Sequence, residues 1–399
     1  MAFKDKEVTV GFTLIGRGGW TGGETYLRNM LRMISKRLEG KVKARLFLSP
    51  AQHANLGPTF DGLLSSPIIV DQCVETAGQG SRAIKSIVVG SDRAFANLVL
   101  ANNIDVMFES AQWLGNQFPI PVISWIPDFQ HRRMPHYFSH RAWWKRDLGF
   151  RLQTSGKRVI MLSSLDAKND CEKYYPSSIG KTSVVSFVSD IAISSHRGFG
   201  SEMRKIYNLP ERFYFLPNQF WRHKNHSIVV AALTKLKMEG KIDKVPAIIL
   251  SGLNKDARAP QHFDSLMQEV KVSEIESHFN FLGLIPYDHV LKIIGCCELL
   301  INPSLSEGWS TPIEEAKTLG AALLLSDIPL HREQAPQALF FDANSIDATA
   351  NALLHCVESR PKAHHSVSIL EKAQNARLEH YASDFFNAIQ MTKDLADQR

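Results

Sequence analysis

The 399-residue sequence has few cysteines, and none of them forms a recognisable metal or disulfide pattern. The five are Cys73, Cys171, Cys296, Cys297 and Cys356. Their number is odd, they are scattered, and no Cys-x-x-Cys pair occurs, which argues against a zinc site and against a disulfide framework. We expect buried thiols in a reducing compartment.

Long hydrophobic runs are also missing. No run approaches the roughly 18 apolar residues of a membrane span, and the N-terminus MAFKDKEVTV has no apolar signal core. We therefore expect a cytoplasmic protein, with peripheral contact at the inner face of an anionic membrane as an open alternative.

The sequence contains no Asp-x-Asp triplet and no other evident carboxylate cluster for a divalent ion. We therefore expect no metal and no cofactor. The net charge of +6 is too low for a typical nucleic-acid-binding protein, but it suits an anionic ligand or a negatively charged membrane surface.

Short apolar runs alternate with helix-like stretches along the chain, which predicts an α/β protein with parallel sheets covered on both faces. The length favours two domains. We expect one at 1–195 and one at 205–375, joined by a Ser- and Gly-containing linker at Ser189–Gly200. The expected strands are Val8–Ile15, Ala44–Leu48, Pro67–Val70, Ile104–Phe108, Val122–Ile126, Val159–Leu162, Ser183–Val188, Arg212–Leu216, Ala247–Leu250, Phe279–Leu282, Glu298–Pro303, Ala322–Ser326 and Leu339–Phe341.

The segment Ser306–Gly320, SEGWSTPIEEAKTLG, combines a loop, a helix start and paired carboxylates. Thr311 suits the N-cap, with Pro312 at N1, Glu314 at N3 as a capping box and Gly320 as the C-cap. Glu307 would then lie in the loop and Glu315 in the first turn. The amides of Gly308, Trp309 and Ser310 would run into a helix N-terminus, which attracts anions.

A second glycine-rich loop follows the first predicted strand, in the sequence Gly16–Gly23. It does not match the dinucleotide pattern Gly-x-Gly-x-x-Gly, because Thr21 occupies the third glycine position. The region about 20 residues further on is basic, with Lys36 and Arg37, where NAD enzymes have an acidic residue. These features argue against an NAD site. The loop could bind another ligand, or it could be a tight turn that contacts no ligand.

The run NPSLSEGWSTPIEEAKTLG, followed by SDIPLHREQAP, resembles the Glu-x7-Glu region of the retaining, GT-B-fold glycosyltransferases of family 4. The resemblance implies that Glu307 contacts the transferred sugar and that Glu315 contacts the ribose of the nucleotide. It also implies donor binding by the segment between them, Gly308–Thr311. Gly18 and Gly19 correspond to the glycine loop that faces the interdomain cleft in this family.

The segment Pro217–His226, PNQFWRHKNH, partly matches the family's diphosphate-binding region. Lys224 matches the lysine of the family pattern, which implies a catalytic role beside the leaving diphosphate. The usual arginine is absent, since Asn218 and Gln219 stand in its place. Arg222 is a substitute at a different spacing, and all three are candidate donor-binding residues.

The segment Pro127–Arg133 resembles the acceptor-domain motif of the same family, with Asp128 and His131 as the matching catalytic candidates. The alternative is structural, with Asp128 capping a turn and His131 bonding backbone. From His131 to Arg158, basic residues are interleaved with aromatics. This composition suits an anionic lipid surface, but it also suits a helix that packs its aromatics on its own domain.

Together these resemblances imply the GT-B fold, with two Rossmann-like domains facing a central cleft and a C-terminal helix, about 376–399, crossing back to the first domain. The implied activity moves a sugar from a nucleotide diphosphate sugar to a hydroxyl of a glycan or lipid-linked saccharide. PNQFWRHKNH and IPDFQHRRMP look like bacterial surface-polysaccharide enzymes, which makes mannose from GDP-mannose the first expectation. An NDP-sugar epimerase and a non-catalytic nucleotide-binding subunit of a polysaccharide assembly complex remain alternatives.

Overall fold

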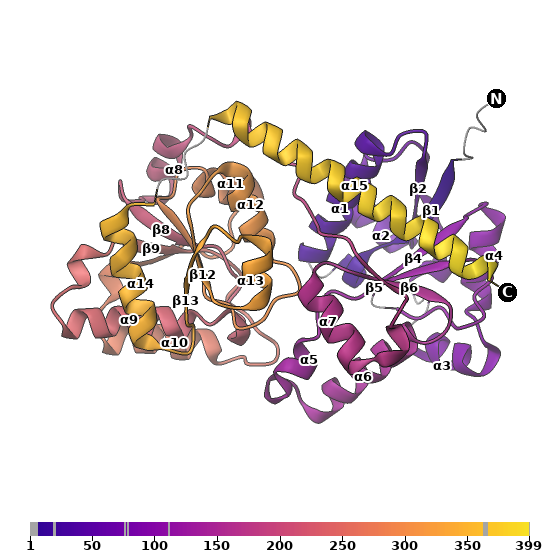
Figure 1. The fold of residues 1–399 in the computed structure, drawn as a ribbon, viewed down its shortest axis with the longest axis horizontal. Coiled ribbons are helices and arrows are strands. Elements are labelled where there is room, and N and C mark those ends of the chain that lie inside the picture. Colours follow the sequence, from indigo (N-terminus) through magenta and orange to yellow (C-terminus); the bar gives the residue numbers. More distant parts are fainter. Residues whose placement is uncertain are drawn as a thin grey trace. The chain divides into compact units, whose positions relative to one another are not determined.

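The chain folds into two compact units. The computed structural model describes residues 7–18, 21–75, 77, 80–110, 112–361 and 366–398. The first unit comprises Met1–Asp190 together with Ala376–Arg399, and the second comprises Ile191–Asn375. In each unit a sheet runs through the centre with helices on both sides (Figure 1).

The first unit contains a seven-stranded parallel sheet in the order β3-β2-β1-β4-β5-β6-β7. Its central strands are almost completely buried, as expected for strands covered on both faces. The strands are β1 Val8–Thr13, β2 Val42–Leu48, β3 Ile69–Val70, β4 Val106–Ser110, β5 Val122–Trp125, β6 Arg158–Leu162 and β7 Thr182–Val184.

Helices connect these strands. The α-helices are α1 Thr21–Arg37, α2 Pro50–Leu56, α3 Gly80–Val89, α4 Arg93–Ala101, α5 Gln130–Arg133, α6 His140–Thr154 and α7 Leu165–Tyr174. The short 3-10 helices are η1 Ile15–Gly18, η2 Gly57–Phe60, η3 Gln72–Val74, η4 Pro135–Tyr137 and η5 Pro176–Ser178.

The second unit contains a six-stranded parallel sheet in the order β10-β9-β8-β11-β12-β13. Its strands are β8 Phe213–Leu216, β9 Ala247–Leu250, β10 Phe279–Phe281, β11 Leu299–Asn302, β12 Leu323–Ser326 and β13 Leu339–Phe341. Its α-helices are α8 Gly200–Tyr207, α9 His226–Met238, α10 His262–Val272, α11 Tyr287–Ile294, α12 Thr311–Leu319, α13 Pro329–Gln334 and α14 Ile346–Ser359. Its 3-10 helices are η6 Ile193–Ser195, η7 Arg222–Lys224, η8 Ile242–Lys244 and η9 Glu276–His278.

The last helix, α15 Val367–Asp397, belongs to both units, because the division falls within it, between Asn375 and Ala376. Its later part packs on the first unit. Tyr381 is fully buried there, with its ring 6.1 Å from that of Phe187, and Arg37 donates to Glu379.

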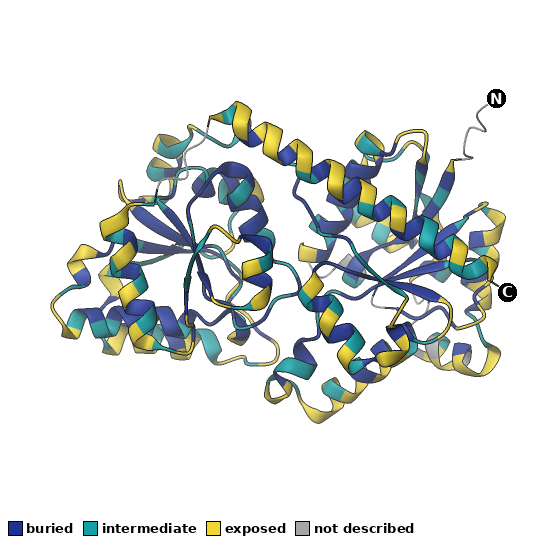
Figure 2. Ribbon diagram, viewed as in Figure 1, coloured by how far each residue is buried: buried dark blue, intermediate teal, exposed yellow. Residues whose placement is uncertain are grey.

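The predicted fold class is confirmed, and each apolar run that the sequence marked as a strand overlaps one, although β7 ends at Val184, short of the predicted Val188. Burial follows the sheets in each unit, while the outer faces of the helices are exposed (Figure 2). None of the described helices is both long enough and apolar enough to span a bilayer. All five cysteines are reduced, and Cys171, Cys297 and Cys356 are buried.

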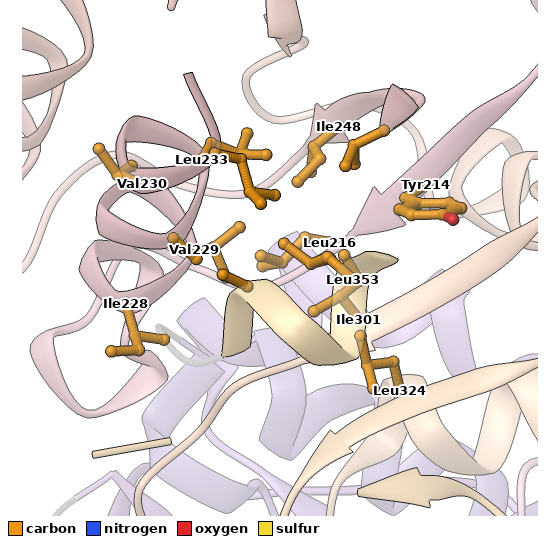
Figure 3. Close-up of a cluster of buried hydrophobic side chains, with 14 of the residues drawn as sticks. Tyr214, Leu216, Ile228, Val229, Val230, Leu233, Ile248, Ile301, Leu324 and Leu353 are labelled. Carbon is orange, nitrogen blue, oxygen red and sulfur yellow. The ribbon is translucent and has the colours of Figure 1, made fainter. Parts of the chain in front are cut away.

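One hydrophobic cluster supports the sheet of the second unit. Residues of α9 and α14, among them Val229, Leu233 and Leu353, pack against the strand residues Ile248 and Ile301 (Figure 3). A separate cluster built from α8, α11 and α12 covers the other face. The sheet is therefore held rigidly from both sides, and so are the loops that leave its strands.

We expect Leu353→Ala to destabilise the second unit by about 2–5 kcal/mol, because it removes a fully buried side chain and leaves a cavity. Urea unfolding of the full chain would show the midpoint of that unit's transition falling. Leu284→Ala is the matched control, since Leu284 is 70% exposed. Equal midpoints for the two variants would contradict this account of the core.

Candidate functional site

The strand order of the second unit determines where a site can form. The chain reverses its direction of winding between β8 and β11, which are neighbours in the sheet. Ligands of open parallel sheets bind at the carboxyl ends of the strands, at such a switch point. The loops that leave β8 and β11 there contain most of the residues that the sequence singled out.

These two loops are joined by buried hydrogen bonds. Asn218, just after β8, donates from Nδ2 to Oδ1 of Asn302 over 3.2 Å. Asn302 donates in turn to Oγ of Ser310 over 2.8 Å. The amide of Leu305 donates to the carbonyl oxygen of His223 over 2.8 Å. The predicted donor-binding residue Asn218 is thus buried and already engaged in holding the loops together.

Lys224 and Glu307 form an ion pair at this edge. Lys224 Nζ donates to Glu307 Oε1 over 2.5 Å, and the two side chains are only 11% and 9% exposed. A nearly buried pair of this kind leaves a costly unpaired charge if one partner is removed. The two residues are 83 positions apart, and the sequence predicted that they would act at the same ligand.

Glu315 lies in α12, and its carboxyl is buried. Tyr287, the first residue of α11, donates from its hydroxyl to Glu315 Oε1 over 2.7 Å. Burial raises the pKa of Glu315 to about 8, and the nearby Glu314 adds to the rise. Glu315 is therefore largely protonated at neutral pH in the ligand-free protein.

The predicted start of this helix needs two corrections. The N-cap is Ser310 rather than Thr311, and no side-chain cap bond and no Glu314 capping box form. Glu315 consequently lies just beyond the first turn. The physical reason is Gln334, which donates to the Ser310 carbonyl oxygen over 2.8 Å and accepts from the Ser310 amide over 3.2 Å.

That bond also changes the predicted anion site, because the Ser310 amide already has a partner. For Gly308, Trp309 and Thr311 the donor-binding role stays a prediction. Gln219 is partly exposed and Arg222 is exposed on η7, at the same edge of the sheet. Their contact with a diphosphate likewise stays a prediction.

In the first unit, Asp128 follows β5 as expected and takes the structural arrangement that the sequence left open. Its Oδ1 accepts from the Gln130 amide over 2.8 Å and from Arg146 over 2.7 Å. Burial opposes ionisation of Asp128, but the Arg146 guanidinium and the Gln130 amide outweigh it, so its pKa is lowered.

His131 is completely buried, and its Nε2 lies 2.9 Å from the hydroxyl of Tyr175. Phe138, Trp143 and Phe150 surround the ring. Burial lowers the pKa of His131 to about 4, so the ring is neutral. The expected direct contact with a sugar does not fit this position, because the ring faces the interior of its own unit.

Gly18 ends η1, directly after the first strand. Gly19 lies outside the described residues. The predicted contact of Gly18 and Gly19 with a ligand therefore stays a prediction.

Three residues at this edge were not assigned a role from the sequence: Tyr287, His331 and Gln334. His331 and Gln334 lie in the run SDIPLHREQAP, directly after β12. The signal was therefore present in the sequence, since residues that follow a central strand at its carboxyl end lie near the switch point. For Tyr287 the sequence offered less, only its position directly after Pro286 at the start of a helix.

Comparison with protein families gives one match, to the model described as "Glycosyl transferases group 1", over residues 201–372. That range covers most of the second unit. The second unit is therefore similar to glycosyl transferases group 1 domains over the matched residues. A comparison with curated proteins gave no match.

Solved structures extend the likeness to the whole chain. A glycosyltransferase from Rickettsia africae ESF-5 aligns with a TM-score of 0.67 and 13% identity, covering 98% of this chain and 100% of that one. Anabaena Alr3699/HepE in complex with UDP gives 0.62 and 15%, covering 98% and 99%. Sucrose-phosphate synthase from Thermosynechococcus elongatus gives 0.63 and 12%, covering 98% of each. The two parallel-sheet units therefore have the GT-B fold.

The protonation of Glu315 gives a pH-dependent test of its predicted contact with the ribose of a nucleotide. Ribose hydroxyls donate best to an ionised carboxylate, so binding should lower the pKa of Glu315 and release its proton. We expect the affinity for GDP or UDP to rise by up to about tenfold per pH unit below pH 8, and to level off above it.

Calorimetry in buffers of different ionisation enthalpy would measure both the affinity and the released proton. Glu315→Gln should remove the dependence, while Glu314→Gln should keep it but move the levelling-off to lower pH, because Glu314 adds to the raised pKa of Glu315. A wild-type affinity that is constant from pH 6 to pH 9 would show that Glu315 does not bind the ribose.

Proposed function

We propose that the protein is a retaining glycosyltransferase, which moves a sugar from a nucleotide diphosphate sugar to a hydroxyl of a glycan or lipid-linked saccharide. The observation that carries this proposal is the Lys224–Glu307 pair at the switch point of the unit that is similar to glycosyl transferases group 1 domains. The UDP named in the Anabaena HepE structure supports a nucleotide-linked donor.

Each polar group at this edge has a chemical role in such a transfer. Lys224 would stabilise the negative charge that develops on the departing diphosphate. Glu307 would accept hydrogen bonds from hydroxyls of the transferred sugar, and Glu315 from the ribose. Each carboxylate bond of this kind is worth about 1.5–3 kcal/mol. Arg222 and Gln219 would extend the contact with the phosphates.

We assign the acceptor to the first unit, with Asp128 at the binding surface and His131 as a buried support. His131 would act on that surface only through its neighbours, because its ring is enclosed. Asp128 is about 29% exposed at its side chain and remains available to an acceptor hydroxyl.

The nature of the available groups supports the proposal of retention. An inverting transfer needs a general base, and a good base has a pKa close to the working pH. Asp128 is the one candidate from the sequence, and its ion pair with Arg146 lowers its pKa. Retention by front-side attack instead lets the departing diphosphate take the acceptor proton, and it requires only that this leaving group be stabilised. Lys224 provides that stabilisation.

We also propose that the reaction needs no divalent metal, since a lysine at the diphosphate supplies the positive charge that a metal would otherwise provide. Mannose from GDP-mannose is the first donor to test. The proposed setting is the synthesis of a cell-surface polysaccharide, including lipopolysaccharide.

A donor screen followed by analysis of the product tests the function. We expect one family of GDP, UDP or dTDP sugars to raise the melting temperature by mass action, and the same sugar to be transferred in EDTA. Proton NMR of the first-formed linkage should show an α-anomer from an α-donor. A β-linked product would exclude retention, donor conversion without an acceptor would indicate an epimerase, and nucleotide binding without turnover would indicate a binding subunit.

Peripheral membrane contact belongs to α6 rather than to the whole basic stretch. Within the basic stretch, Arg132, Arg133, Arg146 and Arg151 form ion pairs inside the first unit. The remaining face of α6 carries Arg141 and Lys145, both exposed and without an ion pair among the described residues, beside Trp144 and Leu148, which are 64% and 55% exposed. These four recur at helical spacing, so they share one face.

We propose that this face binds anionic lipid, because basic residues attract the headgroups while the apolar side chains enter the interface. Arg141→Ala with Lys145→Ala should weaken binding to phosphatidylglycerol-containing vesicles by about 2 kcal/mol. Lys205→Ala with Lys271→Ala removes the same charge elsewhere and should leave binding unchanged. Equal binding to vesicles with and without phosphatidylglycerol would contradict this contact.

A further inference from the structure

His331 is buried at the carboxyl edge of the second unit's sheet, on α13 just after β12. Its Nδ1 lies 3.0 Å from the carbonyl oxygen of Ser326 and 3.0 Å from the Ser326 hydroxyl. That hydroxyl donates to the carbonyl oxygen of Ser304 over 2.5 Å. A carbonyl oxygen only accepts, so Nδ1 carries the ring proton and Nε2 is left as an acceptor.

This acceptor has no hydrogen-bond partner among the described residues, although it is fully buried. Leaving a buried polar group unsatisfied costs about 1–3 kcal/mol. Buried unsatisfied groups are rare in folded proteins, and a role in catalysis is one of their established explanations. Burial also lowers the pKa of His331 to about 4, so the ring is neutral at physiological pH.

The neighbourhood identifies which group that partner is. The Glu307 carboxylate and the Lys224 ammonium are the two charged side chains that act on the His331 ring. The backbone connects them as well, because Ser326 holds Ser304 and the next residue, Leu305, bonds to His223 beside Lys224. Only Lys224 has N–H groups to donate, since an ammonium carries three and Glu307 accepts one of them.

We propose that His331 Nε2 is the acceptor that positions the Lys224 ammonium when a nucleoside diphosphate occupies the site. The proposal rests on the proposed function, in which the donor separates the Lys224–Glu307 pair. Glu307 then accepts from sugar hydroxyls, and the ammonium directs two N–H groups to the diphosphate and the third to Nε2.

A neutral acceptor is suited to this task. A lysine is a mobile point charge on a flexible stem, so it needs a fixed partner if it is to face the leaving group. A carboxylate in that place would cancel the charge that the diphosphate needs. An imidazole held by Ser326 orients the ammonium and leaves its charge intact. His331 is therefore a positioning residue, which acts through Lys224.

Two substitutions separate the two ring nitrogens. The amide nitrogen of His331→Asn can replace Nδ1 and keep the Ser326 bond, while nothing replaces Nε2. The longer His331→Gln can place its amide oxygen where Nε2 was. We expect the Asn variant to lose about tenfold to a hundredfold in kcat, as for a misplaced catalytic group, and the Gln variant to keep most of it. The reverse order would show that His331 only supports the fold through Ser326.

Binding gives a readout that does not need turnover. The Asn variant should bind GDP or UDP more weakly, while its affinity for guanosine or uridine, which carry no phosphate, stays at the wild-type value. Equal loss for nucleoside and diphosphate would overturn the proposal, because a structural defect would affect both.

Nitrogen-15 NMR of labelled histidine in the wild-type chain observes the acceptor directly, without relying on any variant's folding. Saturation with GDP or UDP should move the His331 Nε2 resonance upfield, as for a lone pair that gains a hydrogen bond, and leave Nδ1 in place. Lys224→Met should abolish that shift. If GDP or UDP binds and the Nε2 resonance does not move, the positioning role of His331 is overturned and the proposed function is not. If the resonance moves but no donor is turned over, the proposed function is overturned and the contact with Lys224 is not.

Discussion

The buried side chain of Asn302 holds the functional edge of the second unit together. It accepts from Asn218, from the amide of Ser304 over 3.2 Å and from the Ser304 hydroxyl over 2.6 Å, and it donates to Ser310. One amide thereby joins the ends of β8 and β11 to the start of α12. The Lys224–Glu307 pair depends on this junction, because Lys224 and Glu307 lie in the two loops that it connects.

The charge balance at this edge is compatible with the proposed function, in which an anionic donor reaches a site that already holds a buried ion pair. Lys224 and Glu307 neutralise each other, and burial keeps Glu315 largely protonated. Glu307 and Glu315 therefore add almost no net negative charge to this edge. A binding partner that supplies hydroxyls and phosphate together can separate the pair and satisfy both partners, whereas a simple anion would leave Glu307 unpaired at a cost.

Sequence patterns predicted those parts of the fold that depend on local composition. Buried parallel strands are nearly continuous apolar runs, so strands such as β11 could be located to within a few residues. The start of α12 was misplaced because its amide is satisfied by Gln334, 24 positions away. Likewise, spacing around Asp128 and His131 could not show that Arg146 and Tyr175, 18 and 44 positions away, engage them. Long-range polar pairing is not encoded in a local pattern.

The candidate residues of the second unit and those of the first unit differ in the same way, in how far local pattern and topology determine their positions. In the second unit, the predicted residues meet at a switch point whose geometry follows from strand order, so resemblance and topology agree on one place. In the first unit, His131, Asp147, Arg132 and Tyr175 form a closed polar network inside one helical layer. Because His131 is fully buried and bonds to Tyr175, replacing it would disturb the fold and the surface together. Loss of activity on such a change would therefore not identify His131 as a contact of the substrate, whereas the partly exposed Asp128 has no hydrogen bond to Asp147 or Tyr175 among those described and is the better residue to test.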